Sequence, residues 1–315
     1  MALACISVDL DSLPHYCRIH GLPESMLDEP ARQLVYTAGL QRFLELSSQL
    51  SLPATLFAVG EDLVQEPARA RLREARALGL EVGNHSYAHD YGLTRRPDVT
   101  IARDVERAAE AIAGTLGERP LGFRAPGYAL NATLYQVLCD QGYRYDSSVF
   151  PAAPYYAAKA AVMGALAILG RPSRAMLDTP KVLLAPRDPY FPNPEDPYRR
   201  GAGKMIELPI ATSGIARMPF IGTLVATLPP GPVRSLYRSI RQSKFFNFEL
   251  HAVDLLDSSD GIPAELARHQ RDLTVRGEVK VARLRELFRM MKDDFELTTL
   301  ADAAARINPS VNRDA

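Results

Sequence analysis

Short apolar runs alternate with helical patterns along most of the chain, and no residues typical of hairpin turns separate them. The apolar runs cover residues 3–8, 52–59, 80–83, 121–123, 205–210, 244–250 and 295–298. The helical patterns cover residues 31–50, 66–78, 99–116, 131–141, 232–243 and 279–293, whereas residues 12–30 and the apolar stretch between 210 and 232 are expected to form loops. This alternation predicts an α/β fold with a parallel sheet, and polar residues at several strand ends favour a barrel over an open sheet.

The alternation is interrupted once. Residues 155–169 predict an apolar, alanine-rich helix, and residues 186–200 hold five prolines, which exclude a regular helix or a central strand. We interpret residues 155–204 as an insertion. No linker is long enough to split the chain, so we expect a single domain over residues 1–310.

The composition indicates an ordinary soluble protein. The 37 basic and 37 acidic residues balance, which disfavours nucleic acid as a partner. The three cysteines have neither zinc-type nor redox-type spacing, and the first apolar run begins at once without a leader pattern. We therefore expect a cytoplasmic protein in a reducing compartment.

Polar residues that could carry chemistry follow several of the predicted strands. Asp9 and Asp11 end the first strand, and His85 and His89 follow the third. Imidazole and carboxylate are good ligands for borderline divalent metals, and residues four apart share one face if the segment is helical. Arg124 to Tyr128 and His251 follow two further strands.

These segments together resemble the polysaccharide deacetylase family, the family-four carbohydrate esterases. The resemblance rests on five segments in the family's order, which are Ser7-Val8-Asp9-Leu10-Asp11, Pro53-Ala54-Thr55-Leu56-Phe57, His85-Ser86-Tyr87-Ala88-His89, Arg124-Ala125-Pro126-Gly127-Tyr128 and Glu249-Leu250-His251. It covers residues 3–150 well and 205–300 more loosely. The family implies a distorted (β/α) barrel of about seven parallel strands.

The resemblance also implies a role for each matching residue. Asp11, His85 and His89 would bind a divalent metal, most simply zinc, with cobalt, nickel or manganese as alternatives. Asp9 would be the general base, and Arg124 would fix its orientation. His251 would be the general acid that protonates the departing amine.

Four further residues are candidates for the substrate pocket. A backbone N–H near Tyr128 would share the developing oxyanion with the metal. The family's adjacent aspartates are here Asp-x-Asp, a variant that resembles an intracellular, amide-cleaving branch, and the tryptophan segment that steadies the acid histidine is missing because the chain has no tryptophan. Asp146 or Asp254 could replace that segment, and Glu207 is expected to line the pocket.

We expect a metal-dependent hydrolase that removes an acetyl or formyl group from the nitrogen of an amino sugar in a glycan or lipid-linked saccharide. One alternative is an allantoinase-like hydrolase of ureides or cyclic amides, and another is an inactive glycan-binding homologue. The helix at 232–243 carries Arg234, Arg238 and Arg241 near apolar segments, which suits peripheral contact with an anionic inner membrane face. The competing interpretation is that this helix covers the barrel.

Overall fold

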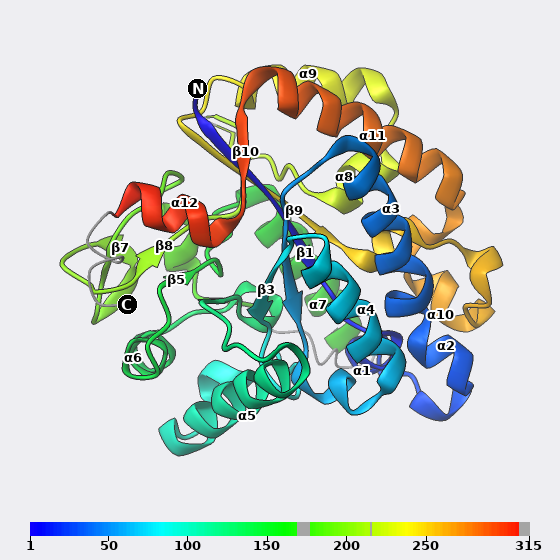
Figure 1. The fold of residues 1–315 in the computed structure, drawn as a ribbon, viewed down its shortest axis with the longest axis horizontal. Coiled ribbons are helices and arrows are strands. Elements are labelled where there is room, and N and C mark those ends of the chain that lie inside the picture. Colours follow the sequence, from blue (N-terminus) through cyan, green and yellow to red (C-terminus); the bar gives the residue numbers. More distant parts are fainter. Residues whose placement is uncertain (169–176, 215, 309–315) are drawn as a thin grey trace.

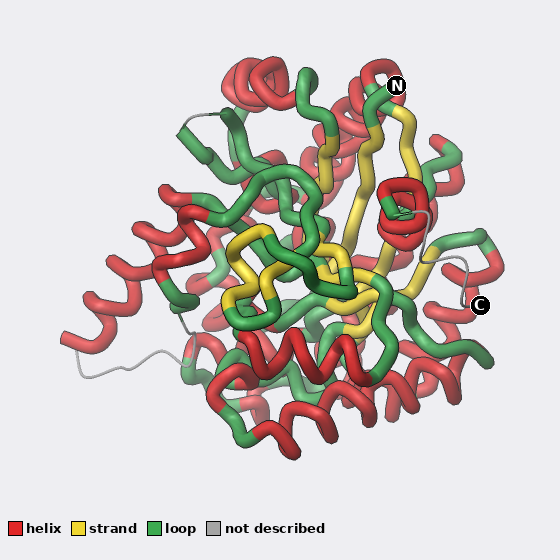
Figure 2. Tube along the Cα trace, turned by 90° about the vertical axis from the view of Figure 1, so that its left-hand side faces the viewer, coloured by secondary structure: helices red, strands yellow, loops and turns green. Residues whose placement is uncertain are grey.

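The computed structural model describes residues 1–168, 177–214 and 216–308. In this part of the chain the main sheet has eight strands, and all of its strand pairs are parallel. The strands are β1 (Leu3–Asp9), β2 (Thr55–Ala58), β3 (Glu81–Asn84), β4 (Gly122–Phe123), β5 (Tyr145–Asp146), β8 (Ile206–Glu207), β9 (Phe245–His251) and β10 (Glu296–Thr298). Helices surround the strands on the outside (Figures 1 and 2).

Strand β1 is the centre of the sheet. One of its edges pairs with β9 from Leu3 to Asp9, and the other pairs first with β10 and then with β2. The order continues from β2 through β3, β4 and β5 to β8. The N–H of Ala211, just after β8, donates to the carbonyl of Asn247 in β9 at 2.9 Å, which joins the two ends. Seven strands therefore curl into a distorted barrel with β10 beside them, and the predicted fold is confirmed.

Side chains alternate across the barrel wall. In β9, Phe246, Phe248 and Leu250 pack outward in the same core as the buried faces of the covering helices. Asn247 and Glu249 point the other way, and both are fully buried. The inward face of β9 is thus polar from Asn247 onward, where the buried network described below is built, whereas inward residues such as Cys5, Phe57 and Phe245 form an apolar cluster.

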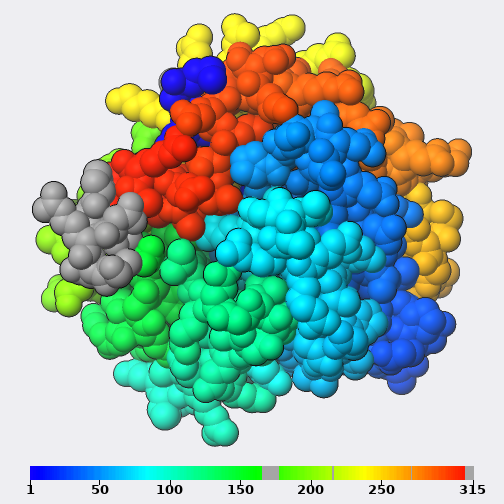
Figure 3. Space-filling model, in the orientation of Figure 1, coloured from blue at the N-terminus to red at the C-terminus, as the bar shows by residue number. Residues whose placement is uncertain are grey.

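The covering helices are α1 (Leu13–His20), α2 (Glu29–Leu34), α3 (Gln41–Leu50), α4 (Glu66–Ala77), α5 (Asp98–Leu116), α6 (Ala132–Asp140), α8 (Gly222–Thr227), α9 (Pro230–Ile240), α10 (Ala264–His269), α11 (Gly277–Asp294) and α12 (Leu300–Ile307). In Figure 3, α11 and α12 in orange and red lie beside the blue and cyan helices α3 and α4, and together they cover this face of the barrel. Asn131 caps α6, as expected, by accepting a hydrogen bond from the N–H of Leu134 at 2.8 Å.

Three predictions of local structure were wrong. The expected loop at 12–30 contains helix α1, whose start is marked by Pro14 in its first turn. The expected helix at 31–50 is interrupted by a π-helical turn, Val35–Leu40. There a side chain at Gly39 would place its Cβ 2.6 Å from the carbonyl oxygen of Ala252, so glycine permits this close approach. An apolar loop was expected where α8 forms.

The segment between β5 and β8 contains helix α7 (Ala153–Ile168) and a two-stranded antiparallel sheet of β6 (Pro192–Asn193) and β7 (Asp196–Arg200). Residues 169–176 of the expected insertion lie outside the described residues. Throughout the described chain, no helix combines the length and apolar character that crossing a bilayer requires.

Candidate metal and catalytic centre

The polar residues predicted from the sequence meet where the barrel strands end. Asp9 and His251 are the last residues of the neighbouring strands β1 and β9, and they are register partners. Asp11 follows two residues after β1, and His85 directly follows β3. The carboxyl ends of parallel strands lie at one edge of a barrel, which is the usual place for a functional site.

Asp11 lies between the two histidines. Its Oδ1 atom is 3.2 Å from Nε2 of His85 and 3.2 Å from Nε2 of His89, and all three residues are buried. Residues 85–89 form a tight loop rather than a helix, and His89 has a φ of +49°. A non-glycine residue adopts this conformation only where its surroundings hold it. Here the Oγ atom of Ser86 accepts a hydrogen bond from the N–H of His89 at 3.0 Å.

The donor set fits a divalent metal. Asp11 Oδ1 and His89 Nε2 are buried and have no hydrogen-bond partner in the described structure. His85 Nδ1 lies 2.7 Å from the carbonyl oxygen of Arg124, which fixes the proton on Nδ1 and leaves the lone pair of Nε2 directed at Asp11. Buried acceptors without a partner are costly. A cation between Asp11, His85 and His89 would satisfy the facing atom of each residue.

The charges within this cluster are interdependent. Burial by itself would raise the pKa of Asp11, but the neighbouring His89 and His85 outweigh it and hold the pKa well below its ordinary value. Burial lowers the pKa of His89 to about 4. Burial also opposes the charging of His85, yet the carboxylates of Asp9 and Asp11 raise its pKa overall. A metal requires a carboxylate beside neutral imidazoles, so its binding would displace the proton that Asp9 and Asp11 favour on His85.

Arg124 lies inside the barrel with no exposed surface. Its Nη1 atom donates to Oδ1 of Asp9 at 2.7 Å, and Nη2 donates to the hydroxyls of Ser7 at 2.9 Å and Ser147 at 2.8 Å. Its guanidinium also lies 4.3 Å from the ring centre of Phe57. This network fixes one oxygen of Asp9, while the other, Oδ2, is free of hydrogen bonds in the described chain and lies 3.9 Å from His85 Nε2.

His251 is oriented by Glu249, a residue that the sequence interpretation missed. Nδ1 of His251 lies 3.0 Å from Oε1 of Glu249, which is fully buried. Nε2 therefore faces the centre, 3.7 Å from Oδ2 of Asp11. Burial opposes the charging of this imidazole, but the Glu249 carboxylate outweighs it and raises the pKa of His251 well above its ordinary value. The clue was the alternation along β9, which places Asn247, Glu249 and His251 on one face.

Asp146 and Asp254 were the two carboxylates expected to orient His251, and the structure places neither of them against its ring. Asp254 accepts a hydrogen bond from the backbone N–H of His251 at 3.0 Å and another from the hydroxyl of Thr223 at 2.8 Å. Asp254 thus supports the backbone beyond β9. Asp146 accepts a hydrogen bond from the hydroxyl of Ser148 at 2.6 Å.

Asp146 and Glu207 form a buried carboxyl pair on the adjacent strands β5 and β8. Both are fully buried and are register partners. Burial and the negative charge of Asp146 raise the pKa of Glu207 well above its ordinary value, so Glu207 holds a proton that it donates to Asp146. Glu207 also accepts a hydrogen bond from the N–H of Val149 at 3.0 Å. These contacts occupy the pair within the barrel wall rather than on an open pocket surface.

Tyr128 reaches the centre through its side chain. Its hydroxyl lies 3.5 Å from Nε2 of His251, and its φ is +64°. Its backbone N–H donates to the carbonyl of Ala125 at 3.0 Å, so this group is already occupied and is not a free oxyanion donor. The preceding Gly127 also has positive φ, and a Cβ there would lie 2.5 Å from the ring of Tyr91.

His15 is a second residue near the centre that lies outside the predicted motifs. It is buried on helix α1, and its ring centre lies 4.6 Å from that of His89. Its ring nitrogens face Glu61 and Asp62 at 3.7 and 3.5 Å. His15 therefore supports the face of His89 that points away from Asp11. His20 and His269 pack against each other elsewhere, with ring centres 5.4 Å apart.

Comparison with known proteins agrees with this geometry. Residues 30–145 match the family model for polysaccharide deacetylase, a range that contains both metal-site histidines and Arg124. This match supports the polysaccharide deacetylase family for the chain. A peptidoglycan deacetylase of Helicobacter pylori is 27% identical over 160 residues, which are 49% of this chain. The match spans 52%, about half, of the length of that relative.

Solved structures extend the likeness to nearly the whole chain at the level of the fold. A crystal structure described as a polysaccharide deacetylase from Mycobacterium smegmatis superposes with a TM-score of 0.62 at 16% identity, covering 98% of this chain and 90% of that one. An allantoinase superposes with a TM-score of 0.59 at 16% identity, covering 98% and 91%. At this identity the two structures support the barrel alone.

Proposed function

We propose that this protein is a metal-dependent hydrolase of the polysaccharide deacetylase family that removes an acetyl or formyl group from the nitrogen of an amino sugar. The observation that carries the proposal is one buried cluster in which Asp11, His85 and His89 stand beside an arginine-held Asp9 and a glutamate-held His251. These are the separate parts that amide hydrolysis needs: a metal site, a base and an acid.

Asp11, His85 and His89 are the residues that would hold the metal. One carboxylate and two imidazoles suit zinc best, with cobalt, nickel and manganese as alternatives, and they leave further coordination positions open. When bound there, the metal would polarise the amide carbonyl and lower the pKa of a water molecule.

Asp9 is the base in this proposal. Arg124, which is itself anchored by the Ser7 hydroxyl, fixes the orientation of the Asp9 side chain, and Oδ2 of Asp9 faces the site without a hydrogen bond of its own in the described structure. That oxygen can accept the proton of the attacking water. The Asp-x-Asp spacing, which we associate with the amide-cleaving branch of the family, brings both carboxylates into one site.

His251 is the acid. Nδ1 is held by Glu249, whose carboxylate raises the pKa of the ring, so in the charged imidazole Nε2 carries a proton that points into the centre. This proton passes to the sugar nitrogen as the C–N bond breaks, and the amine leaves in neutral form. Tyr128, 3.5 Å from the same nitrogen, positions the leaving group.

A second candidate function keeps the same centre and opens a ureide or a cyclic amide. The observation in its favour is the fold likeness to an allantoinase. An inactive glycan-binding protein is the third candidate, and the presence of both Asp9 and His251 in the cluster speaks against it.

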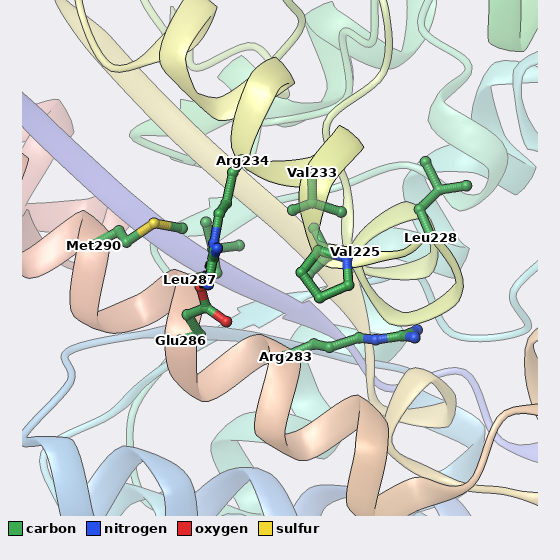
Figure 4. Close-up of a pocket in the computed structure, with 9 residues that line it drawn as sticks. Val225, Leu228, Val233, Arg234, Arg283, Glu286, Leu287 and Met290 are labelled. Atoms are coloured by element: carbon green, nitrogen blue, oxygen red, sulfur yellow. Dashed lines mark hydrogen bonds and ion pairs between the residues drawn. The ribbon is translucent and has the colours of Figure 1, made fainter.

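The arginine-rich helix α9 is relevant to whether the protein would bind its substrate at a membrane surface. Its apolar residues Val233, Tyr237 and Ile240 are buried against the barrel, so only its polar face is free for other contacts. On that face Arg234 is paired with Glu286 of α11 at 2.6 Å beside a small apolar pocket (Figure 4). We propose that the protein is cytoplasmic and that Arg238 and Arg241 contact the anionic inner face of a membrane. Flotation with anionic vesicles tests the contact, and absence of binding would refute it.

The deciding experiment for the function is a substrate panel. Metal-loaded protein is incubated with N-acetyl and N-formyl amino sugars, their oligomers and lipid-linked forms, and separately with allantoin and related ureides, and release of acetate or formate or ring opening is measured. We expect acyl release from the amino sugars. Ring opening of the ureides alone would establish the second candidate instead, and no turnover of either class would favour the third.

A further inference from the structure

Aromatic rings surround the mouth of the proposed centre. Tyr91 packs edge-on against His89 with ring centres 5.2 Å apart, and Tyr128 lies beside His251. Tyr155 of helix α7 lies 6.3 Å from Tyr128 and 5.0 Å from Phe150, measured between ring centres. Such rings offer flat apolar faces on which the C–H groups of a sugar can lie.

Lys159, one helical turn after Tyr155, completes this ring of side chains. Its Nζ atom lies 5.7 Å from the ring centre of Tyr91 and 5.9 Å from that of Tyr155. A single aromatic ring therefore separates the ammonium group from the metal-site residue His89. The same side chain lines a pocket with Gly127, Tyr128, Phe150 and Asp178.

Lys159 is half-buried, yet the described residues include no ion-pair or hydrogen-bond partner for it. Other lysines of this chain show the contrast, since Lys181 pairs with Asp196, and Lys280 and Lys292 donate to backbone carbonyls. Asp178, the carboxylate that shares the pocket, already accepts hydrogen bonds from the Tyr198 hydroxyl and the N–H of Thr179. Only the two tyrosine rings and the longer-range attraction of Asp178 therefore offset the partial burial of this cation.

We propose that Lys159 and the aromatic residues Tyr91 and Tyr155 form a subsite for an anionic substituent, a carboxylate or a phosphate, carried by the substrate beside its acylated amino sugar. The inference rests on the proposed function, because it assigns the substrate class of the same centre. The anion would supply the direct ion pair that Lys159 lacks, and the rings would hold the sugar between Lys159 and the metal site.

The charge of Lys159 sets a pH range for this preference. Burial lowers the pKa of Lys159 to about 8, and the neighbouring Asp178, whose own pKa burial raises to about 6, opposes that shift in part. The tyrosines facing Lys159, Tyr91 and Tyr155, have pKa values raised by burial and stay neutral. Lys159 is therefore charged below about pH 8 and loses its charge above it. An anionic substrate should lose its advantage over the same interval.

The test compares matched neutral and anionic substrates. Metal-loaded wild type, Lys159→Met and Lys159→Arg are assayed with N-acetylglucosamine, its 1-phosphate, and a disaccharide with a neighbouring uronate. In the wild type we expect KM to be roughly 10- to 100-fold lower for an anionic substrate, as one charged hydrogen bond warrants, with little change in kcat. Lys159→Met should remove this advantage of the anionic over the neutral substrate, whereas Lys159→Arg should keep it. The phosphate and uronate arms show which anion is used.

Lys181→Met is the control, because Lys181 is exposed and already paired with Asp196. Equal KM values for neutral and anionic substrates in the wild type, or an advantage that persists in Lys159→Met, would overturn the proposal. Direct binding of the 1-phosphate and the uronate disaccharide to metal-loaded Asp9→Asn separates this from the proposed function. If the wild type hydrolyses nothing but Asp9→Asn binds an anionic compound more tightly than Asp9→Asn/Lys159→Met does, the proposed reaction fails and the subsite stands. Equal affinities would refute the subsite.

Discussion

The Nδ1 atom of His251 lies 3.0 Å from Oε1 of Glu249, and the two residues stand on the same inward face of strand β9. The carboxylate is fully buried, whereas the imidazole keeps part of its surface open to the site. Glu249 thus fixes the orientation of the His251 ring from within the barrel. This pairing gives His251 a fixed orientation with Nε2 facing the centre, and it raises the pKa of the ring.

Replacing Glu249 by glutamine keeps the size of the side chain and removes its charge. Because the Glu249 carboxylate raises the pKa of His251, the variant should lose protonated His251 at lower pH, so the alkaline limb of the kcat profile moves to lower pH. We also expect kcat at pH 8 to fall by roughly 10- to 100-fold, part of the usual contribution of a general acid. Glu278→Gln, at an exposed site, is the control. An unshifted alkaline limb would show that Glu249 has only a structural role.

Removing the shared ligand should abolish metal binding. In Asp11→Asn the two histidines lose the carboxylate that lies 3.2 Å from each, and we expect no retained metal after dialysis and no acyl release. Elemental analysis measures the metal, and circular dichroism checks the fold. His20→Ala is the matched control, since His20 packs against His269 away from the centre. Stoichiometric metal in Asp11→Asn would contradict the assigned ligand set.

Arg124 should matter for stability as well as for activity. Arg124→Met leaves Asp9 buried without its counter-charge, and breaking such a pair costs about 3–5 kcal/mol in the free energy of unfolding. Urea denaturation measures this change. Arg119→Met breaks an exposed pair with Glu106 and should cost no more than about 1 kcal/mol. Equal effects of the two substitutions would mean that the buried network does not stabilise the barrel.

The Asp146–Glu207 pair predicts how stability depends on pH. The pKa of Glu207 is raised in the folded state, so its contribution is fully present below the ordinary glutamate value and is lost as the pH rises through the folded value. Glu207→Gln keeps a neutral side chain at every pH. We therefore expect the variant to lose less stability than the wild type between pH 5 and pH 8 in urea denaturation. A parallel decline in both proteins would show that Glu207 is ionised in the fold.

The barrel could be predicted because its strands and helices alternate with strong periodicity, as in residues 66–83, where a charged helix leads into a short apolar strand. Local sequence signals were weaker where contacts between distant segments determine the backbone conformation. The π-helical turn at Val35–Leu40 depends on the approach of Ala252, more than two hundred residues away. Helix α1 did carry a signal, Pro14 in its first turn, which the histidines of that segment obscured.

The sequence also placed the metal-site and acid–base candidates at strand ends, and the structure brings them together. The sequence could not reveal which residues support these candidates. Glu249 looked like part of an aromatic strand, because the outward phenylalanines dominate its composition. His15 and Lys159 come to the site through helices whose positions depend on the whole fold. Contacts of this kind are set by three-dimensional packing, which spacing along the chain does not encode.

The most direct test of the account is a metal titration of the metal-free protein. Zinc is added in steps, and bound metal and acetate released from an N-acetyl amino sugar are measured in the same samples. We predict that acetate release rises in proportion to bound metal and levels off at about one ion per chain, as a site of three ligands implies. Acetate release that is already complete before metal is bound would contradict the central claim.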